Sequence, residues 1–114
     1  KDNTMSDSPY VFRAGAAPLK QESPTLKVKE AHMLDGMIVR YQERNPAPAN
    51  PDAAWCETGH SAYILSGQLQ YEFPDHVVEV GPGDMVHIPA GYDHRHRPTA
   101  LGGEPVKYFI TEFE

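Results

Sequence analysis

Short stretches of alternating polar and apolar residues, separated by glycine- and proline-rich turns, constrain the fold of this chain most. In 68–73 the order Gln, Leu, Gln, Tyr, Glu, Phe repeats every two residues, which is the period of a β-strand. The dipeptide Asp35-Gly36 separates two further stretches, 26–34 and 37–43, and it readily forms a tight hairpin turn. Such stretches recur about every eight to twelve residues, without helix-length periodicity. The sequence therefore predicts an all-β sandwich or barrel.

The length of the chain predicts one folded domain preceded by an arm. With 114 residues, 39% of them apolar, the chain can build a single core. Residues 1–24 are polar and rich in serine, alanine and proline, so we expect a flexible N-terminal arm. Its one apolar cluster, Tyr10 to Phe12, could dock as an edge strand. Residues 25–114 are predicted to form the barrel domain.

Charge and cysteine content exclude several classes of partner. Acidic residues outnumber basic ones by 16 to 10, a formal charge of −6, so neither nucleic acid nor an anionic membrane is an expected partner. No apolar run approaches the roughly 20 residues that span a bilayer, and no secretory signal begins the sequence. Cys56 is the only cysteine, which excludes an internal disulfide. We expect a cytoplasmic location.

The run 83–98 contains turn residues and histidines at regular spacings. It predicts a short strand over 85–88, a bend at the Pro-Ala-Gly sequence of 89–91, and then a second strand. His94 and His96 belong to that second strand, and residues two apart in a strand point to the same face. Two neutral imidazoles on one inner face make a poor core but a good partial metal site.

This run resembles the second sequence motif of the cupin superfamily, read as Gly, five residues, Pro, one, Gly, two, His, three, Asn. The matching positions are Gly83, Pro89, Gly91 and His94. The motif's closing asparagine is replaced here by Pro98. The resemblance implies a cupin-type double-stranded β-helix, a jelly-roll barrel, with a metal site inside it.

The other cupin motif reads His, one, His, three or four, Glu, six, Gly, and this chain departs from it. With Gly67 as the anchor, His60 occupies the position of the family's glutamate. The family's two histidines would fall at Ala53 and Trp55, or at Ala54 and Cys56. The family's ligand set of three histidines and one glutamate is therefore not carried over, and the resemblance leaves His60 and His94 as metal ligands.

Three further residues could complete a site. Cys56 lies four residues before His60, so an unbroken strand places both on one face, and a thiolate favours zinc or ferrous iron. Glu57 points to the other face unless Gly59 forms a bulge. His96 could be a ligand or could line a ligand pocket. The alternative is that these histidines are core residues hydrogen-bonded to backbone, and that Cys56 is a small buried apolar residue.

Our leading hypothesis is a small cupin that holds one divalent transition metal and binds a small oxygen-rich metabolite in the barrel. Zinc or iron is the expected metal, with manganese or nickel as alternatives. Oxygenase, isomerase and lyase chemistry are all compatible with such a site, and a non-catalytic binding or sensory module is the alternative. We expect a homodimer that pairs through Tyr10 to Phe12 or through the final strand, 105–113.

Overall fold

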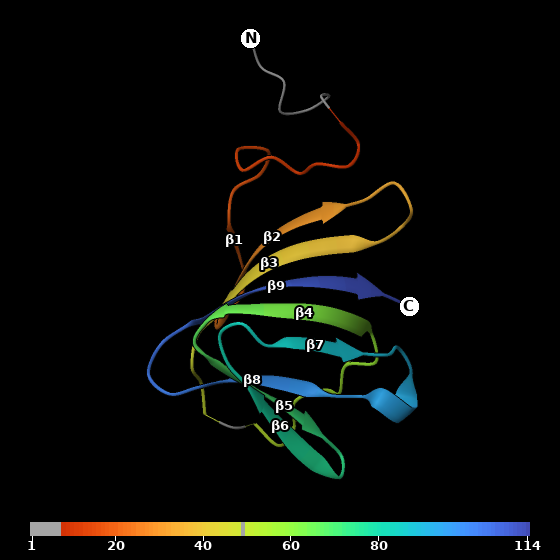
Figure 1. The fold of residues 1–114 in the computed structure, drawn as a ribbon. Coiled ribbons are helices and arrows are strands. Elements are labelled where there is room, and N and C mark those ends of the chain that lie inside the picture. Colours follow the sequence, from red (N-terminus) through yellow and green to blue (C-terminus); the bar gives the residue numbers. More distant parts are fainter. Residues whose placement is uncertain (1–7, 49) are drawn as a thin grey trace.

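The computed structural model describes residues 8–48 and 50–114, which form two antiparallel sheets (Figure 1). The six-stranded sheet runs in the order β1 (Lys20–Ser23), β2 (Leu26–His32), β3 (Ile38–Arg44), β9 (Val106–Phe113), β4 (Gly59–Ser66) and β7 (Met85–Ile88). The three-stranded sheet runs in the order β6 (His76–Val80), β5 (Gln68–Phe73) and β8 (Arg97–Leu101). A single short 3-10 helix, η1 (Tyr92–His94), lies between β7 and β8 in the described chain. The all-β prediction is confirmed.

The predicted hairpin between 26–34 and 37–43 is present as β2 and β3. The two strands pair without interruption from Leu26 opposite Arg44 to His32 opposite Ile38. Gly36 has a φ of 89°, which glycine adopts without strain. The loop is one residue longer than the tightest hairpin, because the Met33 amide bonds the Met37 carbonyl at 2.8 Å and leaves three residues between them.

The core lies between the two sheets and is mostly apolar. Its members are Ala62, Ile64, Leu69, Tyr71, Ile88, Ala100, Val106, Tyr108 and Ile110. On β3 the buried residues are Arg40 and Gln42. Arg40 forms ion pairs with Glu22 and Glu30, and the Gln42 amide donates to the Tyr108 hydroxyl at 2.7 Å. These partners let polar side chains occupy an inner face.

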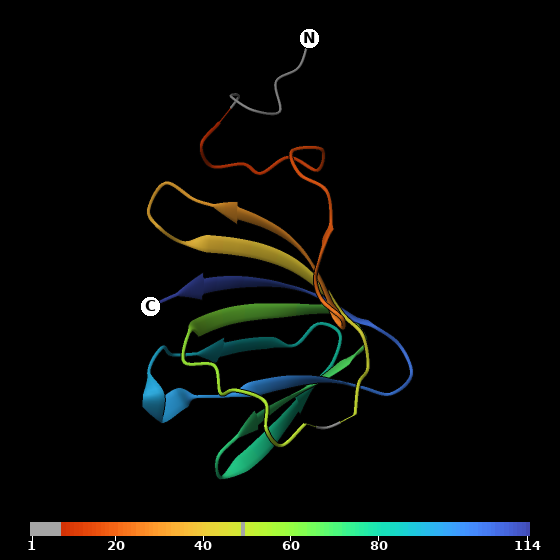
Figure 2. The ribbon, with the colours of Figure 1, turned by 180° about the vertical axis from the view of Figure 1, so that it is seen from behind.

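The final strand does not lie at a sheet edge. β9 pairs with β3 along one side and with β4 along the other. Figure 2 shows it in dark blue between the yellow β3 and the green β4. A strand with both sides paired offers no free backbone groups, so the expectation that the final strand serves as an exchange element is wrong.

The arm supplies an edge strand, but not from the apolar cluster that we expected. β1 (Lys20–Ser23) pairs with β2 at the edge of the six-stranded sheet. Tyr10 lies in a turn and is 78% exposed. Residues 1–7 of the predicted arm lie outside the described residues.

The expected homodimer stays a prediction. Within 8–48 and 50–114, no helix has the length and apolar character needed to cross a membrane.

Candidate metal centre

The first functional side chain, His60, enters the interior from the start of β4. Its neighbour Gly59 lies against β9, where a Cβ atom would come within 2.3 Å of the Phe113 ring and 2.9 Å of the Ala90 nitrogen. Glycine is therefore required for β4 to begin this close to its neighbours. The ladder is regular here, with Gly59 opposite Phe113 and His60 opposite Glu112. No bulge redirects the chain at Gly59, and His60 is 7% exposed.

Cys56 and His96 face the same interior from two loops that meet. The Cys56 amide bonds the His96 carbonyl at 2.8 Å, and the His96 amide bonds the Cys56 carbonyl at 3.0 Å. This isolated antiparallel bridge lies just before β4 in one segment and just before β8 in the other. Residues paired in this way direct their side chains to the same side. Two positions forty residues apart are thus fixed together by backbone hydrogen bonds.

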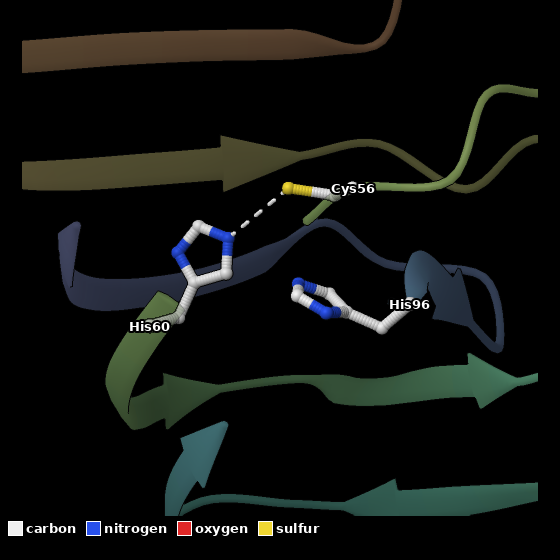
Figure 3. A group of neighbouring side chains, drawn as sticks. All are labelled: Cys56, His60 and His96. Atoms are coloured by element: carbon white, nitrogen blue, oxygen red, sulfur yellow. Dashed lines mark hydrogen bonds between the residues drawn. The ribbon is translucent and has the colours of Figure 1, made fainter. Parts of the chain in front are cut away.

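The three side chains converge in a compact cluster, shown in Figure 3. Their ligand atoms all lie within 4.8 Å of one another. The Cys56 Sγ is 3.6 Å from His60 Nε2, and the two imidazole rings are 5.0 Å apart. Tetrahedral zinc, with bonds of about 2.3 Å to sulfur and about 2.0–2.1 Å to nitrogen, separates such a pair by about 3.6 Å. The donor set therefore fits a transition metal.

Unpaired nitrogen atoms also point to a metal. His96 is 1% exposed, and its Nε2 has no hydrogen-bond partner in the described chain. Its Nδ1 donates to the His94 carbonyl at 3.0 Å, which leaves the Nε2 lone pair directed into the cluster. His60 Nδ1 is also unpaired, 3.9 Å from a Glu112 carboxylate oxygen. A ligand histidine usually hydrogen-bonds an outer partner, and at 3.9 Å the Glu112 carboxylate lies near that position without forming the bond. Leaving a buried nitrogen unpaired costs about 1–3 kcal/mol.

The electrostatics of the cluster favour a thiolate. The hydrogen bond with His60, with a further contribution from His96, lowers the pKa of the Cys56 thiol to about 5. Burial lowers the pKa of His96, but the Cys56 sulfur and the His94 carbonyl raise it more, so the net change is upward. Cys56 is therefore ionised at neutral pH, and the thiolate is the form that binds metals.

We expect metal-free protein to show an unusual alkylation profile. The rate of reaction of Cys56 with iodoacetamide should reach half its maximum near pH 5 and stay level above about pH 6, because the thiol is then fully ionised. Urea-unfolded protein serves as the control, and its rate should keep rising through pH 8–9, since an unperturbed thiol has a pKa of about 8.5. Identical profiles for folded and unfolded protein would contradict the cluster geometry.

Two predicted ligands are not brought into the cluster. His94 is exposed in η1, and the extended chain resumes only at Arg95. The helical turn shifts the alternation of side chains, so our expectation that His94 and His96 share a strand and a face is wrong. His94 contributes its carbonyl to His96 instead of its imidazole. Glu57 is exposed as well, and its carbonyl accepts the Gly91 amide at 2.9 Å.

The cluster lines a cavity of about 370 Å³ between the sheets. Sequence reasoning missed most of its other polar walls, which include Arg40, Gln42, Arg44, Tyr71, Tyr108, Glu22 and Glu112. The first three recur every second residue along β3, which is the signal that could have revealed a polar inner face. Tyr71 and Tyr108 are both packed in the core and part of the cavity wall.

Comparison with known proteins defines the family. The family model described as the Cupin domain matches residues 55–112, more than half of the chain, and this protein therefore belongs to the cupin family. The matched region contains all three residues of the cluster. No match was found among curated proteins.

Solved structures agree with the family. An RmlC-like cupin from Shewanella frigidimarina has a TM-score of 0.69 and 10% identity, covering 92% of this chain and 90% of that one. KdgF from Halomonas sp. has a TM-score of 0.62 and 17% identity, covering 84% and 86%. The polyketide cyclase RemF from Streptomyces resistomycificus has a TM-score of 0.61 and 20% identity, covering 82% and 68%. At these identities the likeness shows the fold, and it confirms the cupin jelly roll.

Proposed function

We propose that this protein binds one divalent transition metal through Cys56, His60 and His96 and presents it to a small oxygen-rich metabolite in the cavity. The single observation that supports this most is the convergence of one sulfur and two imidazoles within 4.8 Å, with His96 Nε2 buried and unpaired. A thiolate with two imidazoles favours zinc or ferrous iron over magnesium or calcium.

The donor set resembles a reactive site more than a structural one. Structural zinc sites are closed by four protein ligands, whereas this cluster has three and borders a cavity. A metal held there would supply a Lewis acid for an oxygen of the ligand. The protein would hold that centre through Cys56, as a thiolate, and through His96, which the His94 carbonyl orients. Isomerase, lyase and oxygenase reactions all use such a centre.

The competing proposal is a sensory or binding module without turnover, and one observation favours it. Both carboxylates that line the cavity lie at Arg40: Glu22 pairs with it directly, and Glu112 is 3.8 Å from its guanidinium. A carboxylate that a guanidinium already engages is not free to contact a ligand as a general base. Aerobic turnover assays of zinc-loaded and ferrous protein over a panel of diketones, aromatic diols and hydroxy acids separate the two proposals.

The open position can be tested directly with cobalt. We expect Co²⁺-loaded protein to show thiolate-to-metal absorption, and its visible bands to change on addition of acetohydroxamate, a bidentate oxygen ligand. His94→Ala, which keeps the backbone carbonyl, is the matched control and should respond identically. If cobalt binds but its visible bands do not change when acetohydroxamate is added, the site is closed and structural. That result would contradict the proposal.

A further inference from the structure

One corner of the cavity contains hydrogen-bond donors without acceptors. We call it the donor corner, and it consists of Arg44, Tyr71 and Tyr108, all of which line the cavity that contains the cluster. The Arg44 Nε donates to the Tyr108 hydroxyl at 3.0 Å. In the part of the chain that the structure describes, no carboxylate pairs with Arg44, and its two terminal nitrogens make no hydrogen bond. A guanidinium in a cavity wall without an anion is an unusual feature.

The two phenols extend this surplus of donors. The Tyr108 hydroxyl accepts from both Gln42 and Arg44, which uses its two lone pairs and leaves its hydrogen to point elsewhere. Tyr71 is 3% exposed, and its hydroxyl has no hydrogen-bond partner among the described residues. Burial raises the pKa of Tyr71, so this group stays protonated and remains a donor. Donor hydrogens that face a cavity and have no acceptor of their own favour an anionic oxygen ligand.

The donor corner lies close to the metal ligands. Besides burial, the charges of Tyr108, Arg44 and Cys56 affect the pKa of Tyr71. The phenol therefore interacts electrostatically both with the rest of the donor corner and with the cluster. Its ring centroid is 5.9 Å from that of His96. Arg44 also borders a larger groove of about 940 Å³ that the loop after β3 lines. One small molecule can therefore contact the donor corner and the cluster together.

The charges of the cavity limit the ligand to a monoanion. Arg40 and Arg44 are the two cationic side chains that line the cavity, and Glu22 and Glu112 are the two carboxylates that line it. Glu30 also pairs with Arg40. Glu22 and Glu112 lie at Arg40, so the cation left for a ligand is Arg44. A phosphate dianion would exceed the available positive charge.

We propose that the cavity selects a small monocarboxylate bearing a second oxygen, with its carboxylate on the donor corner and the rest of the molecule facing Cys56, His60 and His96. This inference rests on the proposed function, because the metal proposed at these three residues would hold the second oxygen of the ligand. The volume limits the ligand to small metabolites, since about 370 Å³ is the space of roughly twelve water molecules at ~30 Å³ each.

The test is calorimetric titration of zinc-loaded protein with matched probes. Glycolate, 3-hydroxypropanoate and 4-hydroxybutanoate are compared with ethylene glycol, 1,3-propanediol and 1,4-butanediol, which replace the carboxylate by a neutral hydroxymethyl group. Charge-assisted hydrogen bonds should make at least one carboxylate bind about tenfold or more tightly than its diol. Removing zinc should weaken this binding. Inorganic phosphate should bind more weakly than the best carboxylate.

Single substitutions test which residues cause carboxylates to bind more tightly than diols. Arg44→Gln should abolish the preference for carboxylate over diol while zinc affinity is retained, and Arg44→Lys should keep part of it because the charge remains. Tyr71→Phe should weaken the binding of the carboxylates and leave the binding of the diols unchanged. Lys107→Gln removes an exposed positive charge from the opposite face of β9 and should change nothing.

The outcomes separate this inference from the proposed function. If the wild-type protein takes up no zinc, the proposed function fails. If zinc binds but carboxylates and diols bind equally, or phosphate binds best, the monocarboxylate inference alone is overturned. Retention of the full preference in Arg44→Gln would overturn it as well, provided that circular dichroism shows the variant folded.

Discussion

His96→Ala is expected to lower the affinity for zinc by at least about a hundredfold, because replacing even a supporting residue behind a ligand costs about 10–100-fold. The imidazole is 1% exposed, and its free Nε2 is directed at Cys56 and His60, so no other group of the described chain replaces it in the cluster. Competition with a chromophoric chelator measures the affinity. Zinc at a hundred times its dissociation constant should also stabilise the wild-type protein by about 2.7 kcal/mol. The melting temperature should rise by on the order of 10 °C.

His94→Ala is the matched control for this experiment. The two histidines are two residues apart, yet only His96 has its ring in the cluster, while His94 is exposed and acts through a backbone carbonyl that alanine retains. His94→Ala should therefore keep both the zinc affinity and the thermal stabilisation. If His94→Ala lost zinc binding and His96→Ala retained it, the cluster described here would not be the metal site.

Gly67→Ala is expected to destabilise the fold by about 2–5 kcal/mol, the sum of about 1–2 kcal/mol for a left-handed conformation and about 1–3 kcal/mol for steric overlap. Gly67 joins β4 to β5 with a φ of 86°. A Cβ there would lie 2.8 Å from the Pro105 carbonyl oxygen and 2.9 Å from the Val106 Cα. Both are backbone atoms, so a rotamer change cannot relieve the overlap. Urea unfolding measures the loss as a lower midpoint with an unchanged slope.

Gly36→Ala separates the two contributions. Gly36 has nearly the same φ, 89°, but no atom lies within 4 Å of its added Cβ. Only the conformational cost of about 1–2 kcal/mol should appear. Equal losses in the two variants would mean that the turn at Gly67 does not approach β9 as closely as the structure describes.

The fold follows from local patterns, which is why the sequence predicts it well. Asp35-Gly36 forms its hairpin because Gly36 adopts a positive φ and the Asp35 carboxylate accepts the Met37 amide at 3.0 Å. The clean alternation of 68–73 becomes β5, with Leu69 and Tyr71 buried. The spacing from Gly83 to His94 identified the family. In each case the determinant lies within a few residues of the structure that it forms.

The candidate site depends on contacts that are distant in the sequence, and only part of it could be predicted. Cys56 and His60 were candidates because of their spacing, and they do meet. Assigning His96 to the cluster instead of His94 requires knowing that η1 interrupts the strand and that Cys56 pairs with His96. That bridge is a tertiary contact, and the local alternation of polar and apolar residues does not predict it.

The polar inner face of β3 was missed for a related reason. Arg40, Gln42 and Arg44 alternate with Val39, Tyr41 and Glu43, and hydrophobicity alone assigns the apolar side to the interior. The structure reverses this because Glu22 and Glu30 pair with Arg40 and because Tyr108 accepts from Gln42 and Arg44. Partners from β1, β2 and β9 thus decide which side of β3 faces inward.

Anomalous diffraction at the zinc absorption edge, from crystals grown with zinc, tests the metal centre most directly. We predict one peak in the cavity, about 2.3 Å from Cys56 Sγ and about 2.0–2.1 Å from the Nε2 atoms of His60 and His96. A cavity without a peak, or a peak bound by His94 or Glu57 instead, would contradict the assignment of the metal to this cluster.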